Sequence, residues 1–197
     1  MKAKIAIAGW PQSNKTLLAN TLSNMTGIPF IRNKTIYEWR KTYNFPELIG
    51  WEWSDMFLIS LSSLVERVET ESKFDSFISD GASFTEIVYL KSNFAKQGPN
   101  KMQSERNKML ESLEKVSLSY AAGKYDFIIH ACANDPLCVN GMYEQLYVKY
   151  KLPYKMYYTE SINDALPDII TDLGLPVKLS IESSIYKART NLFGKVG

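Results

Sequence analysis

The chain has 197 residues, and its hydrophobic fraction of 45% permits a sizeable core in one α/β domain with a small lid. Its formal net charge of +2 argues against a protein that coats nucleic acid, although a local basic groove stays compatible with that charge. Two cysteines, Cys132 and Cys138, and one histidine, His130, are too few for a disulfide framework or a zinc site. Because we find no apolar signal segment and no run long enough to span a membrane, we expect a cytoplasmic protein with reduced thiols.

The first predicted element is an apolar strand at residues 5–8, followed by a loop at 9–16 and an amphipathic helix at 17–25. The loop reads G-W-P-Q-S-N-K-T and matches the phosphate-binding pattern G-x-x-x-x-G-K-[ST], except that Asn14 stands at the second glycine. Asparagine is one of the few residues that enter the left-handed backbone region readily, so we expect it to be tolerated there.

This P-loop predicts a site for a nucleoside triphosphate. Its backbone N–H groups and the helix N-terminus would surround the phosphate oxygens, Lys15 would add a full positive charge, and the Thr16 hydroxyl would hold Mg²⁺. The residues expected to contact the triphosphate are Gly9, Pro11, Gln12, Ser13, Asn14, Lys15, Thr16 and Leu17.

Strands and helices alternate along the rest of the chain. Four more strands are predicted, at residues 27–31, 75–80, 125–131 and 154–158. Helices are predicted between and after them, within 57–68, at 82–93, within 109–120, at 139–150 and at 162–173. Five strands separated by helices imply a parallel, right-handed α/β sandwich.

Apolar stripes predict which face two of the helices bury. The first stripe consists of Phe57, Leu61, Leu64, Val65 and Val68. The second consists of Met109, Leu113, Val116 and Tyr120. In the tail from 175 to 197, alternation at Val177, Leu179 and Ile181 is typical of a strand, and partial disorder is the alternative.

Ligands of such sheets bind at the carboxyl ends of the strands. That edge would hold the P-loop, Asp80 after the third strand, and residues 134–135 after the fourth. Asp80 ends an apolar strand where a Walker-B carboxylate belongs, so it could hold Mg²⁺ through water or accept the proton of an attacking hydroxyl. The competing interpretation is a turn residue in the pair Asp80-Gly81.

Basic residues flank the turn at Gly98-Pro99 and could form a lid over the nucleotide, although a solvated surface is the favoured interpretation for most of them. These residues are Lys91, Lys96, Lys101, Arg106 and Lys108. Arg106 is our choice for a catalytic cation, because a guanidinium matches phosphate geometry.

The aromatic and basic stretch at 32–53 could bind the phosphate acceptor, or its aromatic residues could simply pack in the core. Arg32, Trp51, Glu52 and Asp55 are the candidate substrate-binding residues, the two carboxylates as partners of sugar hydroxyls.

On these residues the chain resembles the P-loop kinases of nucleosides and nucleotides, including a nicotinamide-riboside kinase domain and phage-encoded P-loop kinases. The resemblance rests on the P-loop at 9–16, on Phe77-Ile-Ser-Asp80-Gly81, and on the element order over residues 3–174. It implies a P-loop NTPase three-layer sandwich with strand order 2-3-1-4-5, helices on both faces, and ATP with Mg²⁺ as cofactors. The chain would then be one kinase domain over 1–174 with insertions around 32–53 and 91–108, and a tail over 175–197.

Three functions follow as hypotheses. The leading one is an ATP-dependent kinase of a nucleoside, nucleotide or related small molecule, which could act as a homodimer. The second is a phage-type kinase that phosphorylates a hydroxymethylpyrimidine in DNA, for which the stretch at 32–53 would suit the acceptor. The third is a nucleotide-binding module without catalysis. A GTPase is disfavoured, because no Asn-Lys-x-Asp motif follows the fourth strand.

Overall fold

A computed structural model describes residues 2–45, 52–94, 103–132 and 139–194. The strands are β1 (Lys4–Gly9), β2 (Phe30–Ile31), β3 (Phe77–Asp80), β4 (Phe127–Cys132) and β5 (Tyr154–Tyr158). The helices are α1 (Lys15–Thr26), α2 (Ile36–Tyr43), α3 (Trp53–Ser72), α4 (Thr85–Phe94), α5 (Gln103–Lys124), α6 (Val139–Tyr150), α7 (Ile162–Leu173) and α8 (Ile181–Phe193). No helix in these ranges is both long and apolar enough to cross a membrane.

The strands form a single parallel sheet in the order β2-β3-β1-β4-β5, which confirms the predicted topology. Strand β1 lies at the centre, where Ile5 pairs with Ile78 of β3 and with Phe127 of β4. Because all strands run the same way, their carboxyl ends share one edge, and the P-loop and Asp80 meet there.

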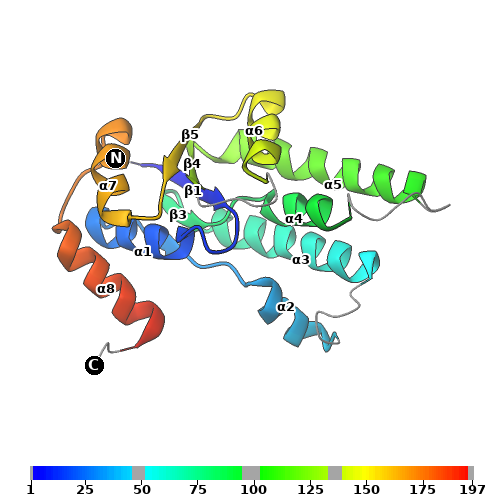
Figure 1. The fold of residues 1–197 in the computed structure, drawn as a ribbon, viewed down its shortest axis with the longest axis horizontal. Helices are drawn as coiled ribbons and strands as arrows, with labels where there is room; N and C mark the ends of the chain where they lie inside the picture. The colour runs from blue at the N-terminus through cyan, green and yellow to red at the C-terminus, as the bar shows by residue number, and fades with distance from the viewer. Residues whose placement is uncertain (1, 46–51, 95–102, 133–138, 195–197) are drawn as a thin grey trace.

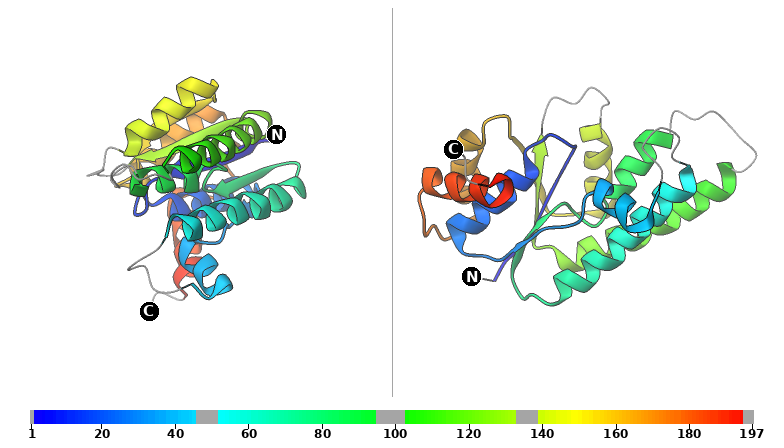
Figure 2. Two further views of the ribbon diagram at one scale, coloured as in Figure 1. Left: turned by 90° about the vertical axis from the view of Figure 1, so that its right-hand side faces the viewer. Right: turned by 90° about the horizontal axis from the view of Figure 1, so that it is seen from below.

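Helices cover both faces of the sheet, as Figures 1 and 2 show. Helices α1 and α7 pack on one face, where Ile5 and Ile7 of β1 point, and α8 lies on the outside of α1. Helices α3, α4, α5 and α6 cover the other face, where Ala6 and Ala8 of β1 point. The alternation of side chains along β1 therefore separates two hydrophobic cores.

The predicted stripe on α3 is wrong for most of its length. Leu61, Val65 and Val68 are exposed, whereas the buried side of the helix carries Arg67 and Glu71. Those two charged residues are buried because both hydrogen-bond to Ser79 of β3, and α3 is rotated about its axis to bring them toward that strand.

Helix α5 departs from its predicted stripe in the same way. Met109 and Val116 are exposed, while Leu113, Leu118 and Ala121 face the core. The buried side of α5 also carries Glu114, whose carboxylate accepts a hydrogen bond from Lys149 of α6.

The tail forms neither the predicted strand nor a disordered segment over its described part. Ser180 caps α8 by accepting a hydrogen bond from the backbone N–H of Ser183. The helix buries the small side chains of Ser184 and Ala188, and it packs against α1. Its last turn therefore lies near the N-terminus of α1 and the P-loop.

Candidate phosphate-binding site

The P-loop starts at a glycine that no other residue could replace without displacing its neighbours. Gly9 has φ of +148°, and a Cβ there would lie 2.5 Å from the Ala131 carbonyl oxygen and 2.7 Å from Ser13 Oγ. The hydroxyl groups of Tyr89 and Tyr143 donate to the Gly9 carbonyl at 3.2 and 3.4 Å. The start of the loop is thus fixed from β4, α4 and α6 together.

Asn14 adopts the left-handed conformation expected at the second glycine position, with φ of 56°. Its side chain also has a partner that the sequence does not reveal, since Asn14 Nδ2 donates to the Thr159 carbonyl at 2.9 Å. The Thr159 hydroxyl in turn donates to the carbonyls of Ser13, at 2.7 Å, and Cys132, at 3.0 Å. These bonds tie the P-loop to the ends of β4 and β5.

Thr16 and Asp80 meet as a Walker-A threonine and a Walker-B carboxylate would. Thr16 Oγ1 donates to Asp80 Oδ2 at 2.7 Å, while Asp80 Oδ1 is buried without a hydrogen-bond partner. Burial raises the pKa of Asp80 above its usual range, and the Thr16 hydrogen bond and the nearby charge of Lys15 partly offset that effect. A ligand that brings a cation or a hydrogen-bond donor to Asp80 Oδ1 would stabilise the carboxylate.

Lys15 stands at the first turn of α1, and its ammonium group donates to the Trp10 carbonyl at 3.2 Å. Burial lowers its pKa, and attraction by Asp80 and Glu86 partly offsets the shift. The charge of Lys15 is therefore held by the Trp10 carbonyl and by the attraction of two carboxylates.

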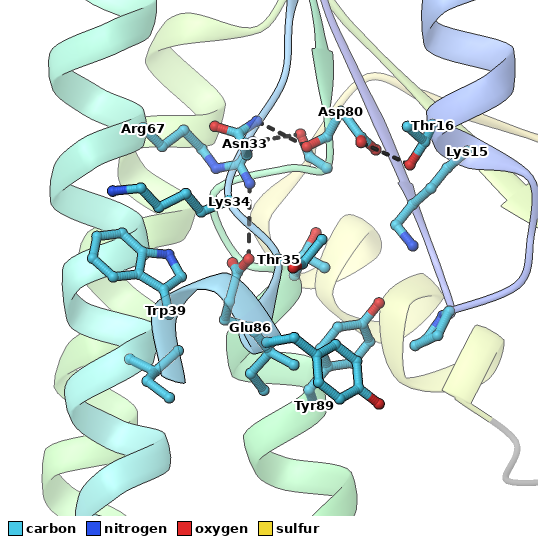
Figure 3. Close-up of a pocket in the computed structure, with 16 residues that line it drawn as sticks. Lys15, Thr16, Asn33, Lys34, Thr35, Trp39, Arg67, Asp80, Glu86 and Tyr89 are labelled. Carbon is cyan, nitrogen blue, oxygen red and sulfur yellow. Dashed lines mark hydrogen bonds and ion pairs between the residues drawn. The ribbon is translucent and has the colours of Figure 1, made fainter. Parts of the chain in front are cut away.

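Two hollows meet at these three side chains. One is a cavity of about 190 Å³ lined by residues of α2, α3, α4 and the loop after β3. The other is an open groove of about 610 Å³ between the outer side of the P-loop, Arg32 and the last turn of α8. Lys15, Thr16 and Asp80 line both, as Figure 3 shows for the cavity.

The cavity wall opposite the P-loop carries a buried ion pair. Arg67 is 1% exposed, and its guanidinium donates to Ser79 Oγ at 3.1 Å and to the Gly81 carbonyl at 2.8 Å. A second guanidinium nitrogen lies 3.8 Å from the carboxylate of Glu86 (Figure 3). Gly81 leaves room for this arrangement, since a Cβ there would lie 3.0 Å from Arg67.

The stretch after β2 closes the cavity from the remaining side. Asn33 donates to Ser79 Oγ at 3.0 Å and to the Asp80 carbonyl at 2.8 Å, which fixes the stretch to the end of β3. Thr35 caps α2 through a capping box with Glu38, and Trp39 from α2 is buried against the cavity.

The sequence-predicted residues separate into two groups. All of the P-loop candidates except Gly9 and Ser13 line the cavity, the groove or both, and Asp80 and Arg32 join them. Arg32 lies in the groove and forms an ion pair with Glu38 at 2.8 Å. Glu52 and Asp55 stand at the start of α3 and line neither hollow, and Trp51 falls outside the described residues.

Arg106 lies away from the P-loop. Its guanidinium is 5.7 Å from the centre of the Trp53 ring, in a separate hollow of about 310 Å³ that Lys91 also lines. Lys91 forms an ion pair with Glu114. Lys96, Lys101 and the Gly98-Pro99 turn lie outside the described residues, so a role for Arg106 as catalytic cation stays a prediction.

Sequence reasoning missed Arg67, Glu86 and Tyr89 as cavity residues. Glu86 carried a usable signal, because it stands in the first turn of the helix that follows the strand ending at Asp80. Arg67 carried none, since an Arg and a Glu four residues apart on a helix usually form a surface pair.

A magnesium ion fits the donors of this site. The oxygens of Thr16 and Asp80 are hard ligands of the kind Mg²⁺ prefers, and Asp80 Oδ1 is a buried acceptor without a partner. The described residues contain no group of three or more His, Cys, Asp or Glu side chains that could hold a metal ion alone. A metal here would depend on phosphate oxygens and water for its remaining ligands.

No family model and no curated protein matches the sequence. Solved structures match in fold. Deoxyadenosine kinase from M. mycoides with bound dATP has a TM-score of 0.65 and 15% identity over 87% of this chain and 99% of its own. The structure of that enzyme with the products dCMP and a flexible dCDP has a TM-score of 0.64 and 17% identity over 88% of this chain and 98% of its own. The chain therefore has the fold of P-loop kinases, as the resemblance in sequence implied.

Proposed function

We propose that the protein is an ATP-dependent phosphotransferase that passes the γ-phosphate to a nucleoside, nucleotide or related small molecule. The observation that carries this proposal is the meeting of two hollows at Lys15, Thr16 and Asp80. Phosphoryl transfer needs a donor and an acceptor on opposite sides of one phosphoryl group, and positioned charge around that group.

The groove suits the donor. Its volume of about 610 Å³ lies in the range of nucleotide pockets, and Gln12, Asn14 and Leu17 from the P-loop and α1 line it. Backbone N–H groups at the N-terminus of α1 would bind the phosphate oxygens, with Lys15 beside the β- and γ-phosphates. Thr16 and Asp80 would hold Mg²⁺, which would neutralise part of the phosphate charge.

The cavity suits the acceptor. At about 190 Å³ it is smaller than the groove, and residues of helices α2, α3 and α4 line it. Its lining combines the aromatic rings of Trp39 and Tyr89 with charged groups near the P-loop. The M. mycoides enzyme that shares the fold is a deoxyadenosine kinase, which favours a nucleoside-like acceptor.

The test is transfer of label from γ-labelled ATP, with magnesium, to three acceptor pools: nucleosides, nucleoside monophosphates, and DNA that contains hydroxymethylpyrimidines. Transfer to either small-molecule pool supports the proposal. Transfer to DNA alone would favour the DNA kinase hypothesis instead. ATP binding by calorimetry without transfer to any pool would leave a binding module.

Lys15→Ala is the variant that links such transfer to the P-loop. Because Lys15 faces the phosphates, we expect the rate of transfer to fall about 10²–10³-fold and ATP binding to weaken. Lys73→Ala is the matched control, since Lys73 is exposed on α3 and pairs with Glu69. An unchanged rate in Lys15→Ala would show that the loop does not bind the donor.

A further inference from the structure

Glu86 is a carboxylate of the cavity to which the proposed function assigns no role. It stands in the first turn of α4, its side chain is 16% exposed, and its carboxylate points toward Arg67 in the wall of the cavity that Asp80 and Lys15 also line (Figure 3). Burial lowers the pKa of Lys15, and the negative charge of Glu86 partly offsets that shift. Glu86 thus lines the cavity and not the groove, whereas Lys15 and Asp80 line both.

The two carboxylates of the cavity have different surroundings. Asp80 accepts the Thr16 hydroxyl and lies on the P-loop side, where donor phosphates and a metal would be. Glu86 comes from the opposite wall, where the Arg67 guanidinium lies 3.8 Å from its carboxylate. Asp80 is placed for the donor, and Glu86 is placed for the acceptor.

The charges of the lining limit what the acceptor can be. Lys34 pairs with Glu66 at 2.8 Å, and Arg67 lies between Glu71 at 3.6 Å and Glu86 at 3.8 Å. Among the described residues that line the cavity, this leaves Lys15 as the cation without an ion-pair partner, and the donor would use it. An acceptor phosphate would face two carboxylates and no spare cation, whereas an uncharged hydroxyl would not be repelled.

Two residues that line the cavity also carry buried donor groups, which would suit the base of a nucleoside or a nucleotide equally. Arg67 Nε and Trp39 Nε1 are both buried without a hydrogen-bond partner, and both residues line the cavity. Unpaired buried donors cost free energy unless a ligand or water accepts from them. A carbonyl oxygen or ring nitrogen of a nucleobase is a suitable acceptor for such donors.

We propose that Glu86 is the catalytic base of this reaction. We also propose that the group that accepts the phosphate is an uncharged hydroxyl, as in a nucleoside, and not a phosphate, as in a nucleoside monophosphate. This inference rests on the proposed phosphotransferase function. The O–H bond of the acceptor breaks and its proton passes to the Glu86 carboxylate. The hydroxyl oxygen bonds to the γ-phosphorus, the bond from that phosphorus to the β–γ bridging oxygen breaks, and ADP leaves.

The experiment compares wild type with Glu86→Gln, using γ-labelled ATP and magnesium with deoxyadenosine and deoxycytidine, with their monophosphates, and with hydroxymethylpyrimidine DNA. We expect wild type to label the nucleosides and not the monophosphates. In Glu86→Gln, kcat with a nucleoside should fall about 10²–10⁴-fold while the Kd of ATP stays unchanged. Glu86→Asp keeps the carboxylate and should recover part of the rate.

Two controls separate the chemistry from the support of Arg67. Glu71→Gln removes the other carboxylate beside Arg67, which does not line the cavity. Glu69→Gln changes an exposed glutamate on α3. The groups that face Glu86 are Lys15, Arg67, Asp80, Tyr89 and Tyr143. None of these five residues is substituted in Glu86→Gln, Glu71→Gln or Glu69→Gln. Only Glu86→Gln removes the proposed base, so only this variant should change the acidic limb of the kcat/KM profile against pH.

The outcomes distinguish the two proposals. No transfer by wild type overturns the proposed function and this inference together. Transfer by wild type with a normal kcat in Glu86→Gln, or an equal loss and an unchanged pH profile in Glu71→Gln and Glu86→Gln, overturns the role of Glu86 alone. Labelling of monophosphates overturns the acceptor class. Labelling of DNA without nucleosides supports the hydroxyl and overturns the small-molecule acceptor.

Discussion

The two faces of the sheet are built from different chemistry. On the α1 and α7 side, β1 and β3 contribute Ile5, Ile7 and Ile78 to an aliphatic core. On the α3 to α6 side, the core includes tyrosines, and it surrounds the three charged residues that are buried within the described ranges, Arg67, Glu71 and Glu114.

The aliphatic face therefore stabilises the fold, whereas the polar face also shapes the cavity. The aliphatic face loses free energy only in proportion to the volume removed from it. The polar face binds Ser79, Gly81 and Glu86 through one guanidinium, so a change there alters the cavity as well as the stability. Variants on each face, and at the edge between them, can test this separation.

The largest effect on activity is expected at the edge. Asp80→Asn should lower the rate of transfer about 10²–10³-fold, because a neutral amide can neither neutralise the charge of a metal ion nor accept a proton at the phosphoryl group. Because burial raises the pKa of Asp80, the folded state binds more protons than the unfolded state between the usual Asp range and the raised pKa. The free energy of unfolding therefore decreases as pH rises through that window.

Asparagine does not ionise, so Asp80→Asn should be more stable than wild type above the window and equal to it below. Denaturant unfolding between pH 4 and 8, an interval chosen to bracket the window, measures this difference. Asp75→Asn is the control with the opposite sign, since Lys2 lowers the pKa of the exposed Asp75 carboxyl. A destabilised Asp80→Asn would mean that the carboxylate supports the fold.

The next comparison sets one face against the other. Arg67→Met leaves buried carboxylates without their cation and should cost roughly 3–5 kcal/mol of unfolding free energy. Leu166→Ala in α7 removes a fully buried aliphatic side chain and should cost about 2–5 kcal/mol. Both variants lose stability, but only Arg67→Met should lose transfer per folded molecule.

Activity at low temperature, normalised to the folded fraction, checks this expectation. The rate of folded Leu166→Ala should stay within about twofold of wild type, because its contacts lie in the core of the aliphatic face. If folded Arg67→Met transferred phosphate normally, the buried ion pair would serve stability alone and the two faces would not differ in kind.

The smallest effect is expected at Asn14. Asn14→Ala loses the bond to Thr159 and places alanine in the left-handed region, for a cost of about 2 kcal/mol. Asn14→Gly loses only the bond, should remain within about 1 kcal/mol of wild type, and should retain turnover. Thermal unfolding of the pair separates the backbone effect from the hydrogen bond, and equal stabilities would remove the conformational argument.

The sequence predicted the part of the site that local patterns specify. The P-loop could be predicted because its glycine, lysine and threonine are fixed by local backbone geometry, and Asp80 because it ends an apolar strand. The strand order followed from resemblance, and the structure confirms it.

The polar face could not be predicted, because its chemistry depends on contacts between distant elements. Glu71 has no visible reason to be buried until Ser79, Tyr120 and Tyr125 hydrogen-bond to it from β3, α5 and the turn before β4. Helix α8 was missed for a related reason, since it buries Ser184 and Ala188, which give no hydrophobic signal.

The bonds between Thr159 and the P-loop have a consequence for the order in which the chain folds. Thr159 lies 145 residues after Asn14 and 146 after Ser13, and β1 pairs with strands whose residues begin at 77 and 127. During synthesis the N-terminal segment emerges first, yet its loop gains these anchors only after residue 159 has been made. The earliest motif of the sequence thus gains these anchors late in synthesis, after the four strands that follow it in the chain have been made.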